Sequence, residues 1–150
     1  MHKCLLVGLG NIGVGYDLSK DKKSNILTHA KAITMHSNFE LVAGVDKSKA
    51  RCVKFSQHFD KPSFTNLNSA LKELLPDIVI VATSTKTHFN IIKLIIKLCK
   101  PKVILCEKPL DYNLSDAEKI IEICKFNNIE LFVNYMRISD TGVIEIKKRI

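Results

Sequence analysis

The chain has 150 residues, 46% of them hydrophobic, which is long and apolar enough to bury the core of one domain. Its net charge of +8 comes mainly from lysines scattered along the sequence, a pattern that argues against nucleic-acid binding. The five cysteines include no CxxC pair and lie partly in apolar runs, which argues against a disulfide scaffold or a zinc site and fits a reducing cytoplasm.

Short runs of β-branched and aliphatic residues alternate with longer stretches of helical periodicity. The predicted strands are Lys3–Gly8, Leu41–Asp46, Asp77–Ala82, Lys102–Cys106 and Glu130–Asn134. The predicted helices are Asn25–Ser37, Ser48–Phe59, Asn66–Leu75, Thr87–Lys100, Ser115–Asn127 and Val143–Ile150. This alternation predicts an α/β fold with a doubly wound parallel sheet, a Rossmann fold of three α/β/α layers, formed by residues 1–150 as one domain.

Two apolar runs need a decision between a soluble element and a membrane or signal segment. The run Cys4–Val7 ends directly in glycines, so a first strand is the better interpretation. The run Ile91–Leu98 is interrupted by Lys93 and Lys97 and is too short to cross a bilayer. We therefore expect no membrane partner.

The segment after the first predicted strand reads GLGNIG and matches the pattern GxGxxG. A lone match is weak evidence, but its position after a buried strand at the start of the chain raises its weight. Gly8 permits a tight turn, Gly10 lets the backbone approach a pyrophosphate, and Gly13 allows close helix–strand packing. The N–H groups that follow attract phosphate oxygens. Gly8, Gly10, Asn11, Ile12 and Gly13 are therefore predicted to bind a dinucleotide.

An acidic residue, Asp46, ends the second predicted strand, where a carboxylate binds the adenosine ribose hydroxyls. It lies further from the glycines than the usual ~20 residues, and an insertion at Gly15–Asn25 accounts for the excess. A carboxylate there favours NAD because it repels a 2′-phosphate, while Lys47, Ser48 and Arg51 leave NADP open. The alternative role for Asp46 is to cap the next helix.

Three further segments extend the pattern. Val81–Ile92 reads VATSTKTHFNII, Cys106–Leu110 reads CEKPL, and Asn134–Arg137 reads NYMR after the last predicted strand. Together with GLGNIG, these segments resemble the glucose–fructose oxidoreductase/inositol dehydrogenase (Gfo/Idh/MocA) family, with its threonine–histidine segment and its EKP motif. The resemblance covers nearly the whole chain.

The resemblance implies the NAD(P)-binding domain of an oxidoreductase that transfers a hydride between the nicotinamide and a sugar-like alcohol or ketone. The EKP lysine, here Lys108, is the implied catalytic residue: it lies near the nicotinamide and positions or polarises the substrate oxygen. Glu107 is implied near the nicotinamide ribose. The other residues implied to line the cofactor cleft are Thr83, Ser84, Thr85 and His88.

One part of the family pattern has no counterpart in this sequence. The family's second domain, a largely antiparallel sheet that carries a catalytic Asp and His, is expected to be absent from this chain. We therefore keep a second hypothesis, a non-catalytic NAD-binding module or a truncated fragment. Substrate selectivity and pairing of subunits belong largely to that second domain, so the substrate and a homo-oligomer stay open. The residues after Arg137 also depart from the family's continuation.

Several candidate residues have a simpler interpretation from the sequence alone. Lys108 precedes a proline, whose turn explains the pair without chemistry. His88 fits the start of a helix, and His29 and His36 are expected on helix surfaces. Cys106 is interpreted as strand packing. No spacing of His, Cys and Asp suggests a metal site.

Overall fold

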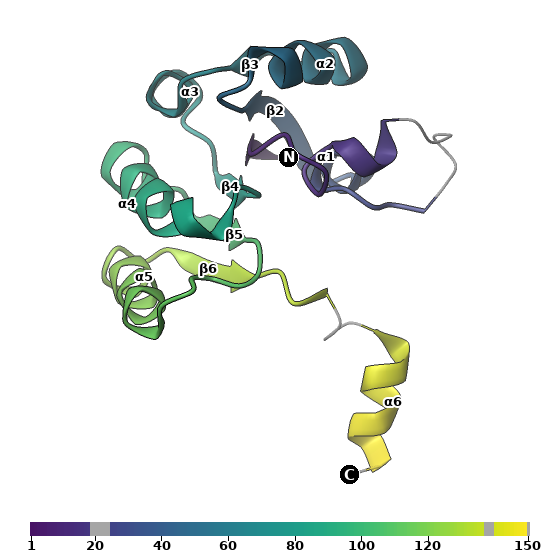
Figure 1. The fold of residues 1–150 in the computed structure, drawn as a ribbon, viewed down its shortest axis with the longest axis vertical. Coiled ribbons are helices and arrows are strands. Elements are labelled where there is room, and N and C mark those ends of the chain that lie inside the picture. Colours follow the sequence, from purple (N-terminus) through teal and green to yellow (C-terminus); the bar gives the residue numbers. More distant parts are fainter. Residues whose placement is uncertain (19–24, 137–139, 150) are drawn as a thin grey trace.

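A computed structural model describes residues 1–18, 25–136 and 140–149 of the chain. Its centre is a six-stranded sheet in the order β3-β2-β1-β4-β5-β6, with every neighbouring pair parallel (Figure 1). The strands are β1 (His2–Val7), β2 (Phe39–Val45), β3 (Ser63–Phe64), β4 (Ile78–Val81), β5 (Val103–Cys106) and β6 (Glu130–Val133). The predicted doubly wound parallel sheet is confirmed.

Helices cover both faces of the sheet (Figure 1). Residues of α1 and α2 share one buried cluster, and residues of α3, α4 and α5 share the other. The helices are η1 (Gly15–Asp17), α1 (His29–Met35), α2 (Lys49–Phe59), α3 (Leu67–Leu74), η2 (Thr85–Thr87), α4 (His88–Leu98), α5 (Leu114–Phe126) and α6 (Thr141–Arg149). None of the α6 residues is buried, and α6 projects away from the sheet.

The observed elements differ from the predicted ones mainly at their ends. The short strand β3 is absent from the predicted set. Its two residues pair only with Gly44 and Val45 of β2, too short a run to show a pattern in the sequence. The first helix begins at His29 rather than Asn25, because Thr28 caps it by accepting the N–H of Lys31.

The predicted insertion between the glycines and α1 begins with η1, and residues 19–24 lie outside the described part of the chain. Asp17 connects the beginning of this insertion to the residues that follow it, Leu27 and Thr28. Its Oδ2 atom accepts hydrogen bonds from the Leu27 N–H (3.0 Å) and the Thr28 hydroxyl (2.7 Å), and Lys31 Nζ lies 3.8 Å from Oδ1. Burial raises the pKa of Asp17, but these hydrogen bonds and the Lys31 charge outweigh burial and hold the pKa below its ordinary value of 3.8.

Asp17→Ala is expected to lower the free energy of unfolding at pH 7 by about 1–3 kcal/mol, because two buried donors lose their acceptor. Since the folded-state pKa is lowered, the carboxylate's contribution is complete above pH 3.8 and is lost as the pH falls further, through the folded-state value. Urea unfolding at pH 7 and pH 3 checks both statements. Asp116 forms a solvent-accessible ion pair with Lys119 at 2.9 Å, and Asp116→Ala serves as the control. We expect this substitution to lower the free energy of unfolding by about 0.5 kcal/mol or less. An Asp17→Ala effect equally large at both pH values would contradict the account.

All five cysteines are free, and most are buried. Burial, together with the neighbouring Glu107 charge, raises the pKa of Cys106 to about 12. Burial also raises the pKa of the Cys4, Cys99 and Cys124 thiols to about 11. These groups therefore stay protonated near neutral pH, and the interpretation of Cys106 as strand packing is confirmed by its complete burial.

Within the described residues, no helix combines the length and the apolar character needed to cross a membrane.

Candidate functional site

The glycine loop joins β1 to the first turn of the following helical segment, and its glycines differ in what they are needed for. Gly8 has a φ of 102°, and a Cβ there would overlap the carbonyl group of Ala82. A Cβ at Gly13 would overlap the Gly8 carbonyl oxygen. At Gly10, by contrast, a Cβ would meet no atom of the described residues within 4 Å. The fold therefore requires glycine at the first and last positions, while the middle position leaves a free approach to the backbone.

In the second half of the glycine loop, the backbone carbonyls are hydrogen-bonded to described residues and the N–H groups are not. Gly10 O accepts from the N–H groups of Val14 and Gly15, and Ile12 O accepts from the N–H of His29. The N–H groups of residues 10–13 have no acceptor among the residues that the structure describes. Successive unpaired N–H groups of this kind form an anion-binding nest, and phosphate oxygens are its natural ligands.

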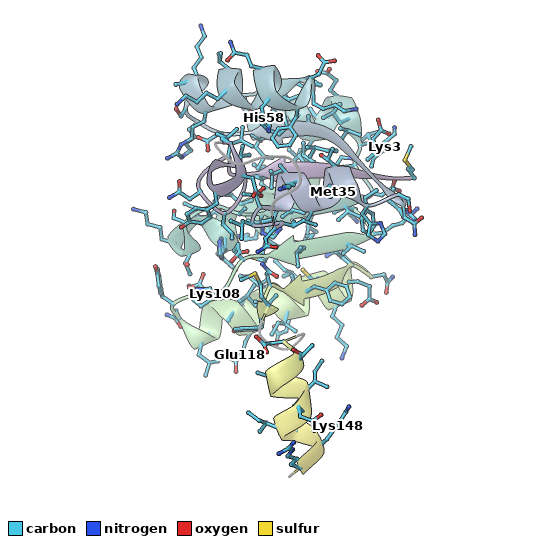
Figure 2. All side chains as sticks on the ribbon, turned by 90° about the vertical axis from the view of Figure 1, so that its right-hand side faces the viewer. Lys3, Met35, His58, Lys108, Glu118 and Lys148 are labelled. Carbon is cyan, nitrogen blue, oxygen red and sulfur yellow. The ribbon has the colours of Figure 1, made fainter. Side chains whose placement is uncertain are left out.

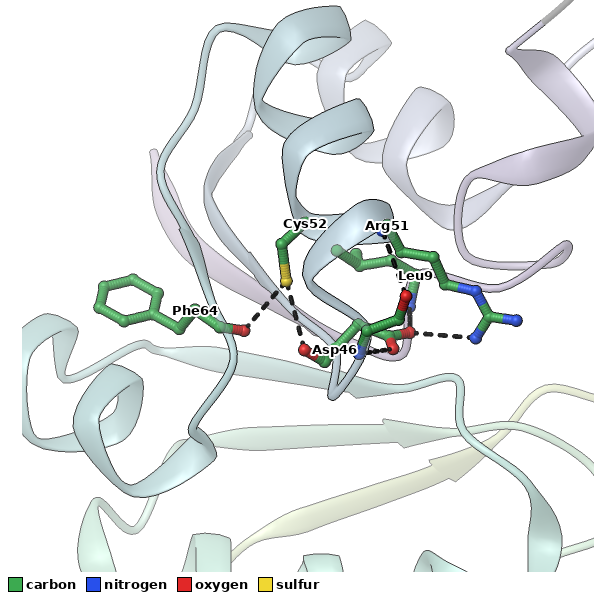
Figure 3. Close-up of polar contacts among 6 residues, drawn as sticks. Leu9, Asp46, Arg51, Cys52 and Phe64 are labelled. Carbon is green, nitrogen blue, oxygen red and sulfur yellow. Dashed lines mark hydrogen bonds and ion pairs between the residues drawn. The ribbon is translucent and has the colours of Figure 1, made fainter.

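Asp46 follows β2 and lies against the glycine loop (Figure 3). Its Oδ2 atom accepts the N–H of Leu9 at 2.9 Å, and its Oδ1 atom accepts the N–H of Ser48 at 2.9 Å. Arg51 Nη1 lies 3.4 Å from Oδ2 on a largely exposed side chain. The cap of α2 is Ser48, whose side chain accepts the N–H of Arg51, and Asp46 supports this turn by accepting the Ser48 N–H while it lies beside the loop. Lys47 is exposed.

The segment after β4 carries the predicted Thr83, Ser84, Thr85 and His88. The Thr87 hydroxyl donates to the Ser84 carbonyl at 2.7 Å and lies 2.9 Å from Thr83 Oγ1. Ser84 is exposed, whereas Thr85 is buried.

His88 is fully buried, which sets its role apart from that of its neighbours. Its two ring nitrogens each lie 3.1 Å from a backbone carbonyl oxygen, Nε2 from Thr83 and Nδ1 from Leu110. A direct contact with a ligand would require His88 to leave these partners. We therefore assign it the support of the two loops after β4 and β5 rather than a place in the lining of the cleft.

Glu107, the first residue of the EKP motif, is buried at the end of β5. Its Oε1 atom lies 2.8 Å from His29 Nε2 and accepts a 2.6 Å hydrogen bond from Asn134 Nδ2, while Oε2 accepts the N–H of Lys108 at 3.3 Å. Burial raises the pKa of Glu107, but the hydrogen bonds from His29 and Asn134 outweigh it, so the pKa lies below its usual range. A carboxylate is thus held ionised beside the motif's lysine.

Lys108 itself is exposed (Figure 2). Among the described residues, its only hydrogen bond is the one that its backbone N–H donates to Glu107. Because the Lys108 side chain is exposed, it is free to contact a ligand at this edge of the domain. The peptide bond between Lys108 and Pro109 is cis.

His29 and Asn134, whose side chains contact Glu107, were not predicted to belong to the site. The expectation that His29 lies on a helix surface is wrong, because its side chain is only 11% exposed and contacts Glu107. His36 is exposed, as expected, but it lies at the C-cap just after α1 rather than within the helix. Asn134 stands in the NYMR segment but carried no predicted role, and Arg137 of that segment lies outside the described residues. His29 was not predicted because it contacts Glu107, which is far away in the sequence. The insertion before α1 also changes the usual spacing between the glycines and this helix, so the position of His29 relative to the loop could not be read from the sequence.

The site residues converge because the carboxyl ends of parallel strands meet at one edge of the sheet. They follow five different strands in turn: Gly8–Gly13 after β1, Asp46 after β2, Thr83–Ser84 after β4, Glu107–Lys108 after β5 and Asn134 after β6. Among the described residues, no group of three or more His, Cys, Asp or Glu side chains is placed to hold a metal ion.

The order of this edge, a glycine loop, a strand-end aspartate and an EKP segment, is matched by a known family. Residues 2–135 match the Gfo/Idh/MocA family model described as "Oxidoreductase family, NAD-binding Rossmann fold". The chain belongs to this family. It is 26% identical over 147 residues to a myo-inositol 2-dehydrogenase of Thermotoga maritima, covering 97% of this chain and 39% of that protein.

Solved structures of other dehydrogenases show the same fold. A probable dehydrogenase from Thermotoga maritima superposes with a TM-score of 0.81 at 25% identity, over 97% of this chain and 40% of that one. The WlbA dehydrogenase from Bordetella pertussis, solved with NADH and UDP-GlcNAcA, gives a TM-score of 0.83 at 20% identity, over 98% and 38%. The chain thus spans about two fifths of the relatives it matches and corresponds to their NAD-binding domain.

Proposed function

We propose that this chain holds NAD at the edge described above and forms the cofactor-binding part of an oxidoreductase acting on a sugar-like alcohol or ketone. The observation that carries the proposal is the free approach to the backbone at Gly10, beside four N–H groups without an acceptor in the described chain. No packing requirement explains a glycine there, whereas a pyrophosphate does. The residues present therefore fit the cofactor.

Each part of the edge has a role in this proposal. The N–H groups of residues 10–13 bind the pyrophosphate, and Asp46 accepts the adenosine ribose hydroxyls. Thr83 and Ser84 border the cleft on the side of β4. NAD supplies the hydride acceptor when it is bound. Lys108 donates a hydrogen bond from its exposed ammonium group to the substrate oxygen and so positions and polarises it.

The substrate class and the compartment are proposed on indirect grounds. The relatives that match are inositol 2-dehydrogenases, which supports a polyol or sugar-like substrate and a role in carbohydrate metabolism. The unpaired cysteines support a reducing, cytoplasmic compartment.

A second candidate is a module that binds NAD without performing chemistry. The two candidates differ in a simple assay. Formation of NADH from NAD and myo-inositol by this chain supports the enzyme, whereas saturable NAD binding without turnover supports the module.

Asp46→Ala is expected to weaken NAD binding by about ten- to a hundredfold, because hydrogen bonds to a charged acceptor contribute about 1.5–3 kcal/mol. Binding of NADP is expected to fall less or to improve, since the 2′-phosphate no longer meets a carboxylate and Arg51 becomes free to pair with it. Calorimetric titration of both cofactors measures the ratio of their affinities.

The exposed Glu118 on α5 gives the charge-matched control, Glu118→Ala, which should leave both affinities unchanged. The ratio of the NAD and NADP affinities separates a specific effect from general damage, because a misfolded loop weakens the binding of both cofactors together. An Asp46→Ala chain that keeps the wild-type preference between NAD and NADP would remove Asp46 from the ribose site.

A further inference from the structure

We propose that His29 is a positioning residue, which acts through Glu107 to fix the backbone at Lys108 and so couples the glycine loop to the EKP segment. The inference rests on the proposed function and deepens it. It assigns a role to a residue that the sequence placed on a helix surface.

The first step is the fixed orientation of the Glu107 carboxylate. It is buried and accepts from three groups: His29 Nε2 (2.8 Å), Asn134 Nδ2 (2.6 Å) and Lys108 N–H (3.3 Å). A carboxylate offers about four acceptor positions, so most of its capacity is already used within the chain. Glu107 is therefore better suited to hold its neighbours than to bind the nicotinamide ribose, the role implied by the family resemblance.

The second step is the attachment of His29 to the glycine loop. The His29 backbone N–H donates to Ile12 O at 3.1 Å, and the next N–H, of Ala30, donates to Gly13 O at 3.0 Å. Ile12 and Gly13, whose own N–H groups have no acceptor in the described chain, thus also carry the carbonyls that anchor α1. His29 contacts the loop through its main chain and the EKP segment through its side chain.

The two steps together join three parts of the cleft that are distant in sequence: the loop after β1, the segment after β5 and the end of β6. The glycine loop and the backbone at Lys108 are thus linked by one chain of contacts, through His29 and the buried carboxylate. It is the arrangement by which a supporting residue orients one that contacts a ligand.

The test compares His29→Ala with His29→Gln, which keeps a donor near the position of Nε2, and with His58→Ala as an exposed histidine control. The first readout needs no cofactor: the backbone amide resonance of Lys108 in the ¹⁵N-labelled chain. It should shift in His29→Ala, return toward the wild-type position in His29→Gln and stay unchanged in His58→Ala. An unshifted Lys108 amide in a folded His29→Ala chain overturns the proposal.

The second readout compares NADH, which reaches the Lys108 end of the cleft, with ADP-ribose, which lacks the nicotinamide. His29→Ala should weaken NADH by about tenfold, the effect of one hydrogen bond to a charged group, and ADP-ribose by less than about twofold. Equal losses for both ligands would indicate general damage and overturn the coupling. If the wild-type chain binds neither ligand, the proposed function fails, and the amide readout alone decides the role of His29.

If His29→Ala does not fold, Asn134→Ala takes its place, because it removes the other side-chain donor to the same carboxylate oxygen. The Lys108 amide is expected to shift in this variant as well. A folded Asn134→Ala chain with an unshifted Lys108 amide would show that the donors to Glu107 do not fix the backbone at Lys108, and it would overturn the proposal.

Discussion

Replacing Gly10 with valine is expected to weaken NAD binding by at least about tenfold while leaving the free energy of unfolding within about 0.5 kcal/mol of wild type. The two effects separate because a Cβ at this position meets no atom of the described residues within 4 Å, so the fold leaves room for the start of a side chain. The added methyl groups instead occupy the space through which a pyrophosphate approaches the backbone. Calorimetric titration and urea unfolding of the same preparation measure the two quantities.

Gly142 in α6 provides the control position for this experiment. It lies outside the site, and Gly142→Val should leave the NAD affinity unchanged. A Gly10→Val chain that binds NAD as tightly as wild type would show that the phosphates do not approach the loop at this residue. A chain that loses binding together with most of its stability would show that the loop depends on Gly10 for folding, contrary to the geometry.

Gly8→Ala, by contrast, should act on stability. We expect it to lower the free energy of unfolding more than the substitutions at Gly10 and Gly142. Gly8 has a φ of 102°, and its added Cβ would overlap the backbone of Ala82 at the end of β4. A strained backbone conformation alone costs about 1–3 kcal/mol. With the overlap of two central strand ends added, we expect a loss of about 3 kcal/mol or more, near the upper range for single substitutions. Urea unfolding monitored by circular dichroism measures it.

The matched comparison is Gly10→Ala, which makes the same chemical change two residues along the same loop. Its free energy of unfolding should stay close to that of wild type. If Gly8→Ala and Gly10→Ala are equally stable, the backbone geometry at Gly8 is not what holds the loop against β4, and the different requirements described for the glycines would be wrong.

Most of the fold follows from local patterns. β4 is a continuous run of buried aliphatic residues, and such runs between helical stretches are typical of a parallel sheet covered on both faces. The helices show their apolar sides in the sequence, and caps such as Ser48 and Asn66 appear at their starts. β3 shows no such pattern, because two residues suffice for its pairing with β2 and neither is fully buried.

The site was predictable where one segment carries its own signal. The glycine loop and Asp46 are recognisable by their place after strands, and the EKP segment by its family resemblance. His29 was not, because its role arises from a contact with Glu107, 78 positions away, that no local pattern records. His88 illustrates the reverse: its segment is recognisable, but only the tertiary structure shows that its ring is buried between two carbonyls.

The most direct test of the central claim, that this chain binds NAD along the carboxyl edge of its sheet, is a titration of the ¹⁵N-labelled chain with NAD followed by NMR. The account predicts that the largest amide shifts fall at residues 10–13, at Asp46, at Thr83 and at Lys108, which follow four different strands. Shifts confined to residues away from this edge, such as those of α4 and α5, or the absence of any saturable shift, would contradict it.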